Sequence, residues 1–178
     1  MLQQVRLRDI GSPEFADAWS LYERVFPFDE RRSLTDHETA MLQEDDFVCL
    51  ALYHSNRFVG VIFYWLLSGC VFVEHLAIVE SARGGGLGST ALNIVKQHDR
   101  PIILEIEPPA DAVGTRRLRF YESAGFVLLP QVHYQLPYQR GGLKLRLFLM
   151  SYPCMATDAC IELFEKEYLE RIMIYSES

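Results

Sequence analysis

The sequence predicts a mixed α/β (α+β) fold, in which a central sheet of about seven strands is flanked by helices and followed by an extra C-terminal helix. Three observations lead to this prediction. Apolar runs of strand length alternate along the chain with amphipathic stretches of helical period. A strand–helix–strand unit over residues 71–107 implies one parallel crossover, and hairpins imply antiparallel neighbours. The length of 178 residues suits one domain with a single core.

The N-terminal stretch predicts one strand and one helix. Residues 5–10 (VRLRDI) alternate apolar and polar side chains, as a half-buried strand does. Ser12 is a suitable N-cap, and Pro13 suits the first helical position. Aromatic residues then recur at helical spacing, so we expect a helix that runs to about Val25 and ends before Pro27.

A second helix and a hairpin are expected next. Thr35 and Glu38 have the spacing of a capping box, which places the start of the second helix at Thr35. Residues 47–54 and 58–66 are apolar and rich in β-branched and aromatic side chains. The three residues between them, 55–57, predict a hairpin loop.

The second half of the chain alternates between strands and helices. A third apolar strand over 71–79 ends at a glycine-rich turn, and Gly125 is a plausible left-handed cap for a later helix. The remaining expected elements are a helix at 87–98, a strand at 102–107, a helix at about 115–124, strands near 126–136 and 143–151, and a C-terminal helix at 157–175.

Composition and charge narrow the function classes. The formal net charge of −7 argues against nucleic acid as a primary partner, because nucleic-acid binders usually carry a basic face. The longest apolar stretch, near residues 59–67, is too short to span a bilayer. The first residues lack the pattern of a signal peptide, and the four cysteines form no CxxC pair. We therefore expect reduced thiols, no membrane partner and a cytoplasmic location.

The glycine turn, SARGGGLGST at residues 81–90, stands between an apolar strand and a helix. The free amides and the dipole of a helix N-terminus attract anions, and glycines let a phosphate approach the backbone. A P-loop is excluded because no Lys follows the glycines. The dinucleotide fingerprint is also excluded, because its third glycine position holds Ser89 and no acidic residue ends the next strand at the expected distance.

Two segments together resemble the GNAT superfamily, the acetyl-CoA-dependent N-acetyltransferases. Residues 83–88 (RGGGLG) match the pattern of Arg or Gln, two residues, Gly, one residue, Gly or Ala. Residues 119–126 (RFYESAGF) are similar to the helix-to-strand segment that carries the tyrosine of that family. The resemblance extends from the first strand to about residue 151. It implies an acetyltransferase domain over 1–151. Residues 152–178 lie beyond the family pattern, and the apolar stripe of Ile161, Phe164, Tyr168 and Ile172 predicts a helical extension packed on the same domain.

The resemblance implies where acetyl-CoA, as cosubstrate, would bind. Two parallel strands splay apart in such folds, and the pantetheine arm enters the gap as an added strand would. The pyrophosphate lies on amides of the turn. The residues implied are Leu76, Ala77 and Ile78 on the strand, and Arg83, Gly84, Gly85, Gly86, Leu87, Gly88 and Ser89 at the turn.

The resemblance also implies the chemistry. The reaction is direct transfer of an acetyl group from the thioester to a primary amine, of a small molecule or a peptide, in a ternary complex. Tyr121 matches the family position of the acid that protonates the departing thiolate. Glu74 lies where some members have a carboxylate, and would serve as base or hold a catalytic water. Strand alternation places Glu74 on the face of Leu76 and Ile78, unless a bulge intervenes.

Several alternatives stay open at this point. Glu105 and Glu107 are further candidates for the base, and His75 suits a structural role. A module that binds acetyl-CoA without turnover is the alternative function. The histidines have no ligand spacing, so no metal is expected. The acceptor pocket would be shaped by the loop between the first two helices, 26–33, and by the last two strands, at 129–140. The C-terminal helix is the candidate for a homodimer contact.

Overall fold

The computed structural model describes residues 2–176 and contains one mixed, seven-stranded sheet in the order β1-β2-β3-β4-β5-β7-β6. Only β4 and β5 pair in parallel, while every other neighbouring pair is antiparallel. This confirms the predicted fold class. The strands are β1 (Leu2–Arg6), β2 (Phe47–His54), β3 (Arg57–Leu66), β4 (Val71–Ile78), β5 (Ile102–Ile106), β6 (Val127–Gln135) and β7 (Leu145–Tyr152).

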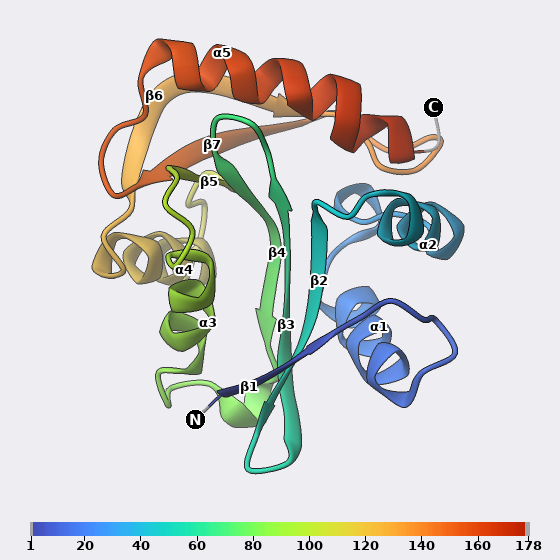
Figure 1. The fold of residues 1–178 in the computed structure, drawn as a ribbon. Coiled ribbons are helices and arrows are strands. Elements are labelled where there is room, and N and C mark those ends of the chain that lie inside the picture. Colours follow the sequence, from blue (N-terminus) through green and yellow to red (C-terminus); the bar gives the residue numbers. More distant parts are fainter. Residues whose placement is uncertain (1, 177–178) are drawn as a thin grey trace.

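Helices cover both faces of this sheet (Figure 1). Residues of α1, α2 and α5 share one apolar core with the first face, and α3 and α4 pack against the second. Among residues 2–176, no helix is both long and apolar enough to cross a membrane. The helices are α1 (Pro13–Val25), η1 (Phe28–Glu30), α2 (Leu34–Gln43), η2 (Glu80–Ala82), α3 (Leu87–Val95), α4 (Ala112–Ser123), α5 (Asp158–Glu167), η3 (Tyr168–Ile172) and η4 (Met173–Tyr175).

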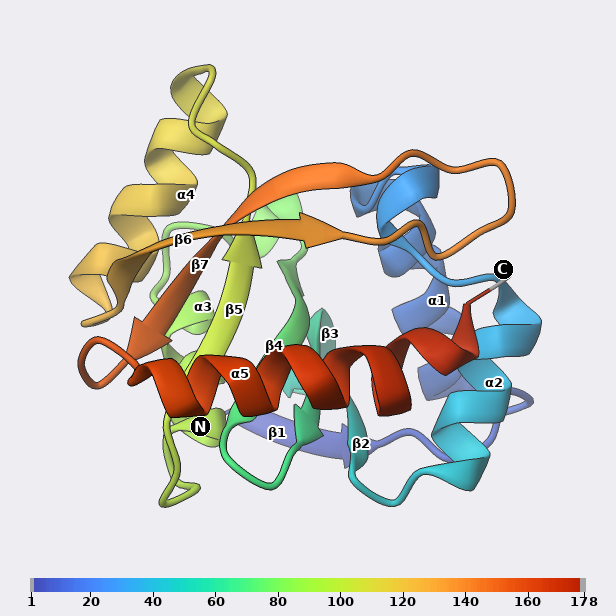
Figure 2. The ribbon, with the colours of Figure 1, turned by 90° about the horizontal axis from the view of Figure 1, so that it is seen from above.

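The parallel pair β4–β5 is short. Only residues 71–73 of β4 pair with residues 102–104 of β5. Beyond this point β4 continues against β3 alone, and β5 continues against β7 alone. Figure 2 shows the ribbons of β4 and β5 lying apart at their C-terminal ends. The predicted crossover therefore exists, and the two strands separate after three residue pairs.

A β-bulge interrupts β4 just where the two strands separate. The register against β3 shifts so that Phe63 pairs with His75 and Tyr64 with Val73, which leaves Glu74 as the extra residue. Glu74 and His75 consequently both contact side chains on the α1–α2 face. Leu76 packs on the opposite face with α3 and α4. The simple alternation, with Glu74 on the face of Leu76, is therefore wrong because of the bulge.

Several predicted boundaries in the N-terminal half also need correction. The first strand ends at Arg6 rather than residue 10, because Asp9 forms a tight turn in which its side chain accepts the Gly11 amide at 2.8 Å. The second helix is capped by Ser33, whose hydroxyl accepts the Asp36 amide at 3.1 Å, and not by Thr35. Ser12 caps α1 as predicted.

Other corrections concern turns and helix ends. The first hairpin has a loop of two residues, Ser55 and Asn56, and not the expected three, because Arg57 already belongs to β3. Both loop residues have positive φ angles, which gives the turn a twist that matches the twist of the two strands. The helix after the glycine turn stops at Val95, and α4 begins earlier than expected, at Ala112. The C-terminal helix is α-helical only to Glu167 and then continues as η3 and η4.

The C-terminal elements pack on the same face as α1 and α2 (Figure 1). Glu167 accepts the Ser68 amide and hydroxyl at about 3 Å. Arg171 pairs with Glu44 at 3.1 Å and Asp46 at 2.9 Å. These contacts attach residues 158–175 to the β3–β4 and α2–β2 turns.

Candidate functional site

The separated part of β4 offers an unpaired backbone edge. Leu76, Ala77 and Ile78 pair with β3 on one side, and no strand among the described residues pairs with them on the side of β5. Such an edge can bind an extended chain as an added strand. Gly60 on β3 allows close packing here, because a Cβ at this position would lie 2.3 Å from the Ala77 carbonyl oxygen.

The glycine turn at the end of this strand is an open cradle. Gly84 and Gly86 have φ angles of 83° and 75°, in the left-handed region that favours glycine. Apart from the adjoining residues of the turn and helix, no described atom lies within 4 Å of where a Cβ would stand on either residue. Gly86 is also the N-cap of α3, so the first amides of that helix point into the same space. The cradle fits an anion such as a diphosphate.

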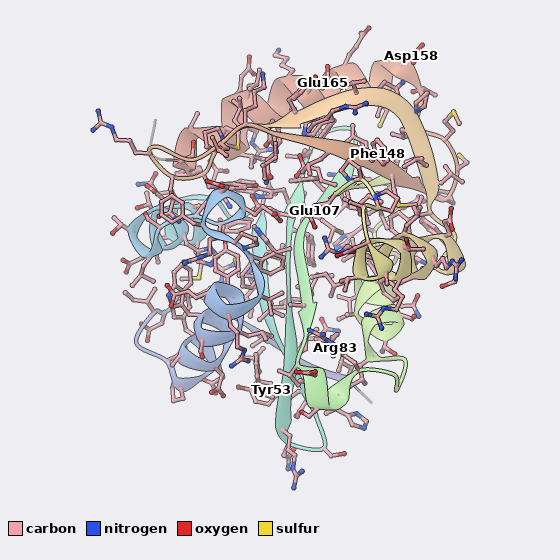
Figure 3. The ribbon with its side chains drawn as sticks, turned by 180° about the vertical axis from the view of Figure 1, so that it is seen from behind. Tyr53, Arg83, Glu107, Phe148, Asp158 and Glu165 are labelled. Atoms are coloured by element: carbon pink, nitrogen blue, oxygen red, sulfur yellow. The ribbon has the colours of Figure 1, made fainter. Side chains whose placement is uncertain are left out.

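The remaining turn residues have different roles. Arg83 lies at the end of β4 (Figure 3), where its Nε donates to the Ile78 carbonyl at 3.0 Å. Gly88 is faced by Phe120 of α4, whose ring would stand 3.1 Å from a Cβ. Gly88 therefore allows α4 to approach α3. Leu87 packs partly against the second core, and Ser89 is exposed on the first turn of α3, while Gly85 adopts no left-handed conformation.

A groove of about 810 Å³ lies next to this turn, on the side of α1. Arg24 of α1 and Arg83 both line it, together with Glu80 and Ser81. The groove is separate from the gap between β4 and β5, and it does not include Tyr121. Its two guanidinium groups extend the positive character of the cradle beyond the helix N-terminus.

Tyr121 lies on α4, on the α3 side of the sheet. Its side chain is 8% exposed and packs against Phe126, with ring centroids 5.8 Å apart. Burial raises the pKa of Tyr121 to about 12. Its hydroxyl is therefore protonated at neutral pH and can act as a proton donor. Within residues 2–176 the hydroxyl makes no hydrogen bond that would occupy this proton.

Glu74 is fully engaged inside the protein. Its side chain is 1% exposed, and Oε1 lies 2.7 Å from Arg32 Nη1. The same oxygen accepts the Tyr138 hydroxyl at 2.8 Å, and Oε2 accepts the Trp65 indole at 3.3 Å. Burial alone would raise the pKa of Glu74, but the Arg32 charge and the hydrogen bonds outweigh it and hold this pKa well below its usual range. The geometry suits a structural carboxylate, and a catalytic role for Glu74 stays a prediction.

Arg32 is the centre of this buried cluster. Its side chain is completely buried and stacks over the Tyr138 ring at 4.7 Å. Its Nε and Nη2 donate to the carbonyls of Tyr175 and Ile172, both at 3.1 Å. Arg32 thus joins the β4 bulge to the α1–α2 loop by an ion pair and the C-terminal segment to the same loop by two hydrogen bonds. Residues 26–33 are rich in charged side chains, as an exposed loop is, so the sequence predicts an exposed Arg32 and not a buried one.

The loop 26–33 and the segment 129–140, which the sequence places at the acceptor pocket, contact each other. Gln139 from the β6–β7 connection donates to the carbonyls of Phe28 and Arg31 in the α1–α2 loop, at 3.3 and 3.0 Å. The Leu143 amide donates to Asp29 at 3.1 Å. Figure 2 shows the β6–β7 hairpin reaching across the molecule toward α1. Tyr138 is buried beneath this bridge, whereas Phe28 and Tyr134 are half exposed.

Three carboxylates gather near the separated strands. Burial, followed by the charge of Glu107, raises the pKa of Glu30 above its usual range, and Glu105 acts in the same direction. Glu107 pairs with Arg117 at 2.8 Å and is half exposed. Figure 3 shows Glu107 closer to the β6–β7 hairpin than Arg83, which lies at the far end of β4. These three carboxylates together favour the binding of a positively charged group on this side of the sheet.

Glu105 is paired with a residue that the sequence did not single out. Its Oε1 is hydrogen-bonded to Nε2 of His133 on β6, and both side chains are more than 90% buried. The partners are separated along the chain by 28 residues and belong to strands on either side of β7. The alternation of residues 132–135 predicts the apolar Val132 and Tyr134 to face inward, but the structure buries His133 and Gln135 instead, and the sheet order brings His133 to Glu105.

Comparison with known proteins agrees with this geometry. Residues 14–126 match the profile of the acetyltransferase (GNAT) family. The chain is 28% identical over 120 residues to YjbC of Bacillus subtilis (strain 168), a protein named as an acetyltransferase. That match covers 64% of this chain and spans only 60% of the length of YjbC.

Solved structures show the same fold. A protein from Bacteroides thetaiotaomicron, named as a GNAT-family acetyltransferase, superposes with a TM-score of 0.82 at 26% identity, covering 96% of this chain and 98% of its own. Arabidopsis thaliana NAA60, in complex with acetyl-CoA, gives a TM-score of 0.63 at 16% identity, covering 85% of this chain and 98% of its own. With its glycine cradle and separated parallel strands, this chain belongs to the GNAT family of acetyltransferases.

Proposed function

We propose that the protein transfers an acetyl group from acetyl-CoA directly to a primary amine in a ternary complex. The observation that carries this proposal is the separation of β4 from β5 beside the open glycine cradle. The free edge of β4 leads directly to the glycine cradle. The cradle suits the anionic end of a long cosubstrate, and the strand edge suits an arm that contains amides.

Acetyl-CoA would supply an activated thioester. Residues Gly84 to Ser89 would hold its diphosphate on backbone amides, and Arg83 would add a cation. The free edge of Leu76, Ala77 and Ile78 would hydrogen-bond the pantetheine arm. The acetyl group would then lie in the gap between the separated strands, away from the helix dipole.

Direct transfer is favoured over an acyl-enzyme because, within residues 2–176, none of the four cysteine thiols lies at this gap. Cys49 and Cys70 are buried, and burial raises the pKa of each thiol well above its usual range. Cys154 follows β7, and Cys160 on α5 contacts the Gly69 carbonyl at 3.8 Å in the turn that precedes β4, at the other end of that strand from the gap. The amine would therefore attack the thioester itself.

Tyr121 is the proposed acid. Because its pKa of about 12 keeps the hydroxyl protonated at neutral pH, it can give a proton to the departing sulfur. The carboxylates of Glu30, Glu105 and Glu107 favour an acceptor that arrives as an ammonium ion, from a small molecule or a peptide. A cytoplasmic location and a homodimer contact through the C-terminal elements stay predictions.

The first experiment is calorimetric titration with acetyl-CoA, followed by a screen of primary amines. The panel holds polyamines, aminoglycosides, amino-acid amides and short peptides with free N-termini. Thiol release is measured with a chromogenic disulfide, and products are checked by mass spectrometry for the added acetyl group. No binding of acetyl-CoA would contradict the proposal. Binding without transfer to any amine would instead favour the alternative, a module that binds acetyl-CoA without turnover.

A further inference from the structure

We propose that Cys70 and Cys160 form an oxidisable pair of thiols, which a low-molecular-weight disulfide such as oxidised glutathione converts into a disulfide bond. The bond would join the turn between β3 and β4 to the first turn of α5. This inference does not depend on the proposed acetyl transfer. It assigns a modification site at the end of β4 that lies away from the glycine cradle.

One face of α5 packs along the turn between β3 and β4, which lies at the α5 end of the sheet (Figure 1). Glu167 accepts the amide and the hydroxyl of Ser68. One turn earlier on the helix, the Leu163 side chain approaches Gly69 so closely that a Cβ there would lie 2.7 Å from it. Another turn earlier, the Cys160 thiol donates to the Gly69 carbonyl at 3.8 Å. Three successive turns of α5 therefore contact this one turn of the chain.

This packing brings two thiols together. Cys70 is the residue after Gly69, and its side chain is completely buried in the core that α5 shares. Cys160 packs against the same core and is partly exposed. The Cys70 thiol donates a hydrogen bond to the Cys160 sulfur, which in turn donates to the Gly69 carbonyl. The two sulfurs are therefore neighbours in the folded chain, as a native disulfide requires.

The two thiols differ in reactivity. Cys160 is the more accessible, and it lies in the first turn of α5, where its amide donates to the Thr157 hydroxyl at 3.2 Å. A helix N-terminus favours a thiolate. Burial raises the pKa of both thiols, and their hydrogen bond raises the pKa of Cys70 further but lowers that of Cys160. The charged side chains that influence Cys70 are Glu167 on α5 and Arg100 before β5. Cys160 is therefore the thiol that reacts first with an external disulfide.

The other two cysteines have different surroundings. Cys49 is buried on β2, where its sulfur lies 3.8 Å from Nε2 of His37. Cys154 is exposed in the connection between β7 and α5. Because Cys154 precedes Cys160 by only six residues, it is the rival partner that an experiment has to exclude.

The oxidation takes place by two exchange steps. The Cys160 thiolate attacks one sulfur of oxidised glutathione, which forms a mixed disulfide and releases the first glutathione thiolate. The Cys70 thiolate then attacks the Cys160 sulfur, and the new S–S bond forms as the bond to the second glutathione breaks. Each released thiolate takes up one of the two protons that the cysteines have lost. Two protein thiols are oxidised, one external disulfide is reduced to two thiols, and excess reduced glutathione reverses both steps.

The disulfide would stabilise the attachment of α5 to the sheet. It would close a loop of about 90 residues and so restrict the unfolded chain. The segment that follows α5 supplies the carbonyls of Ile172 and Tyr175 that bind Arg32, so this segment would be held more firmly as well. The glycine cradle lies beyond the other end of β4, after Ile78. We therefore expect oxidation to change stability and to leave acetyl-CoA binding unaltered.

The test is equilibration of the reduced protein without oxygen in buffers of set glutathione ratio, at mildly alkaline pH. The exchange is quenched with acid, free thiols are alkylated, and bonded peptides are identified by mass spectrometry. Cys160→Ser and Cys70→Ala each remove one partner. Cys154→Ser is the matched control, because it removes an exposed thiol and leaves the pair intact. Thermal unfolding and calorimetry with acetyl-CoA follow on the oxidised and reduced forms.

We expect one bond, between Cys70 and Cys160, in the wild type and in Cys154→Ser. Cys70→Ala should stop at a mixed disulfide between Cys160 and glutathione. At one glutathione ratio, the proportion of bonded to free pairs should be greater in the folded protein than in urea by a factor of about 30 to 1,000. Because folding and oxidation are linked, oxidation should also raise the melting temperature, by about 5–15 °C.

A bond between Cys154 and Cys160 in the wild type would overturn the proposal. Glutathione that remains on Cys160 of the wild type would do so too, because Cys70 would then be out of reach. A bond that forms only in urea, or that lowers the melting temperature, would mean that the native positions do not accommodate it. If Cys70→Ala fails to fold, the wild type and Cys160→Ser decide. None of these measurements needs acetyl transfer, so a failure of the proposed function would be seen separately.

Discussion

Replacing Glu74 by Gln should strongly destabilise the fold, because it removes the countercharge of a completely buried guanidinium. Arg32 and Glu74 have side-chain exposures of 0% and 1% and lie 2.7 Å apart. Breaking a buried ion pair by removing one partner typically costs about 3–5 kcal/mol. Small domains are stable by only about 5–15 kcal/mol, so this loss would be a large part of the whole.

The hydrogen-bond geometry explains why Gln is a poor substitute. Glu74 faces three donors, from Arg32, Tyr138 and Trp65, with two acceptor oxygens. A Gln amide offers one oxygen and one NH₂ group, so at least one of these donors would face another donor. A buried donor left without an acceptor costs about 1–3 kcal/mol. This cost is one part of the total given above, not an addition to it.

The assay is equilibrium unfolding in urea, followed by circular dichroism and tryptophan fluorescence. The matched control is Glu107→Gln, because Glu107 pairs with Arg117 at 2.8 Å but both side chains are about half exposed. An exposed pair contributes only about 0–1 kcal/mol. The same substitution at almost the same ion-pair distance thus isolates the effect of burial. A double variant, Arg32→Met with Glu74→Gln, should recover part of the lost stability.

Equal free energies of unfolding for Glu74→Gln and Glu107→Gln would refute this reasoning. It would mean that the Arg32 guanidinium reaches water or another acceptor once its partner is neutral. The two backbone carbonyls that Arg32 already contacts, those of Ile172 and Tyr175, would then be sufficient to hold it.

Three further predictions follow from the site. First, the depressed pKa of Glu74 contributes stability that is fully present above the pKa of an unfolded glutamate, about 4.3, and is lost as the pH falls below it. The gap in unfolding free energy between wild type and Glu74→Gln should therefore narrow in acid, and a constant gap would contradict the ion pair. Second, Tyr121→Phe should lower turnover by about 10²–10⁴-fold and leave acetyl-CoA affinity nearly unchanged, as measured by steady-state kinetics and calorimetry. Unchanged turnover, where chemistry limits the rate, would remove Tyr121 from the mechanism. Third, Gly86→Val should abolish acetyl-CoA binding in calorimetry by filling the cradle, whereas Gly141→Val, with a similar φ of 82° and equally open surroundings, should bind normally. Both valines should cost about 1–3 kcal/mol of backbone strain, so loss of binding in both would point to misfolding.

Much of the fold could be predicted because it depends on local signals. Ser12 before Pro13 begins α1, and the glycine turn joins a strand to a helix, as the sequence indicated. The environment of Glu74 could not be predicted, because alternation fails wherever one residue is inserted into a strand. That bulge depends on the register between β3 and β4, which no single strand encodes.

The candidate site also contains some features that depend on local sequence and others that depend on distant contacts. The cradle residues are consecutive, so their pattern is visible in the sequence. The pairing of Glu105 with His133 needs the exchange of β6 and β7 in the sheet order, and the burial of Arg32 needs a C-terminal segment more than 140 residues away. Contacts between distant residues decide these features, and composition alone carries no trace of them.

The bonds from Arg32 to Ile172 and Tyr175 have a consequence for the order of folding. They close a loop of 140 residues or more, and such long-range contacts form late because the chain entropy of closure must be overcome first. During synthesis from the N-terminus, the α1–α2 loop emerges long before its partners exist. We expect the α1–α2 loop to reach its final packing only after residues 172–175 have left the ribosome, whereas the glycine cradle can form earlier.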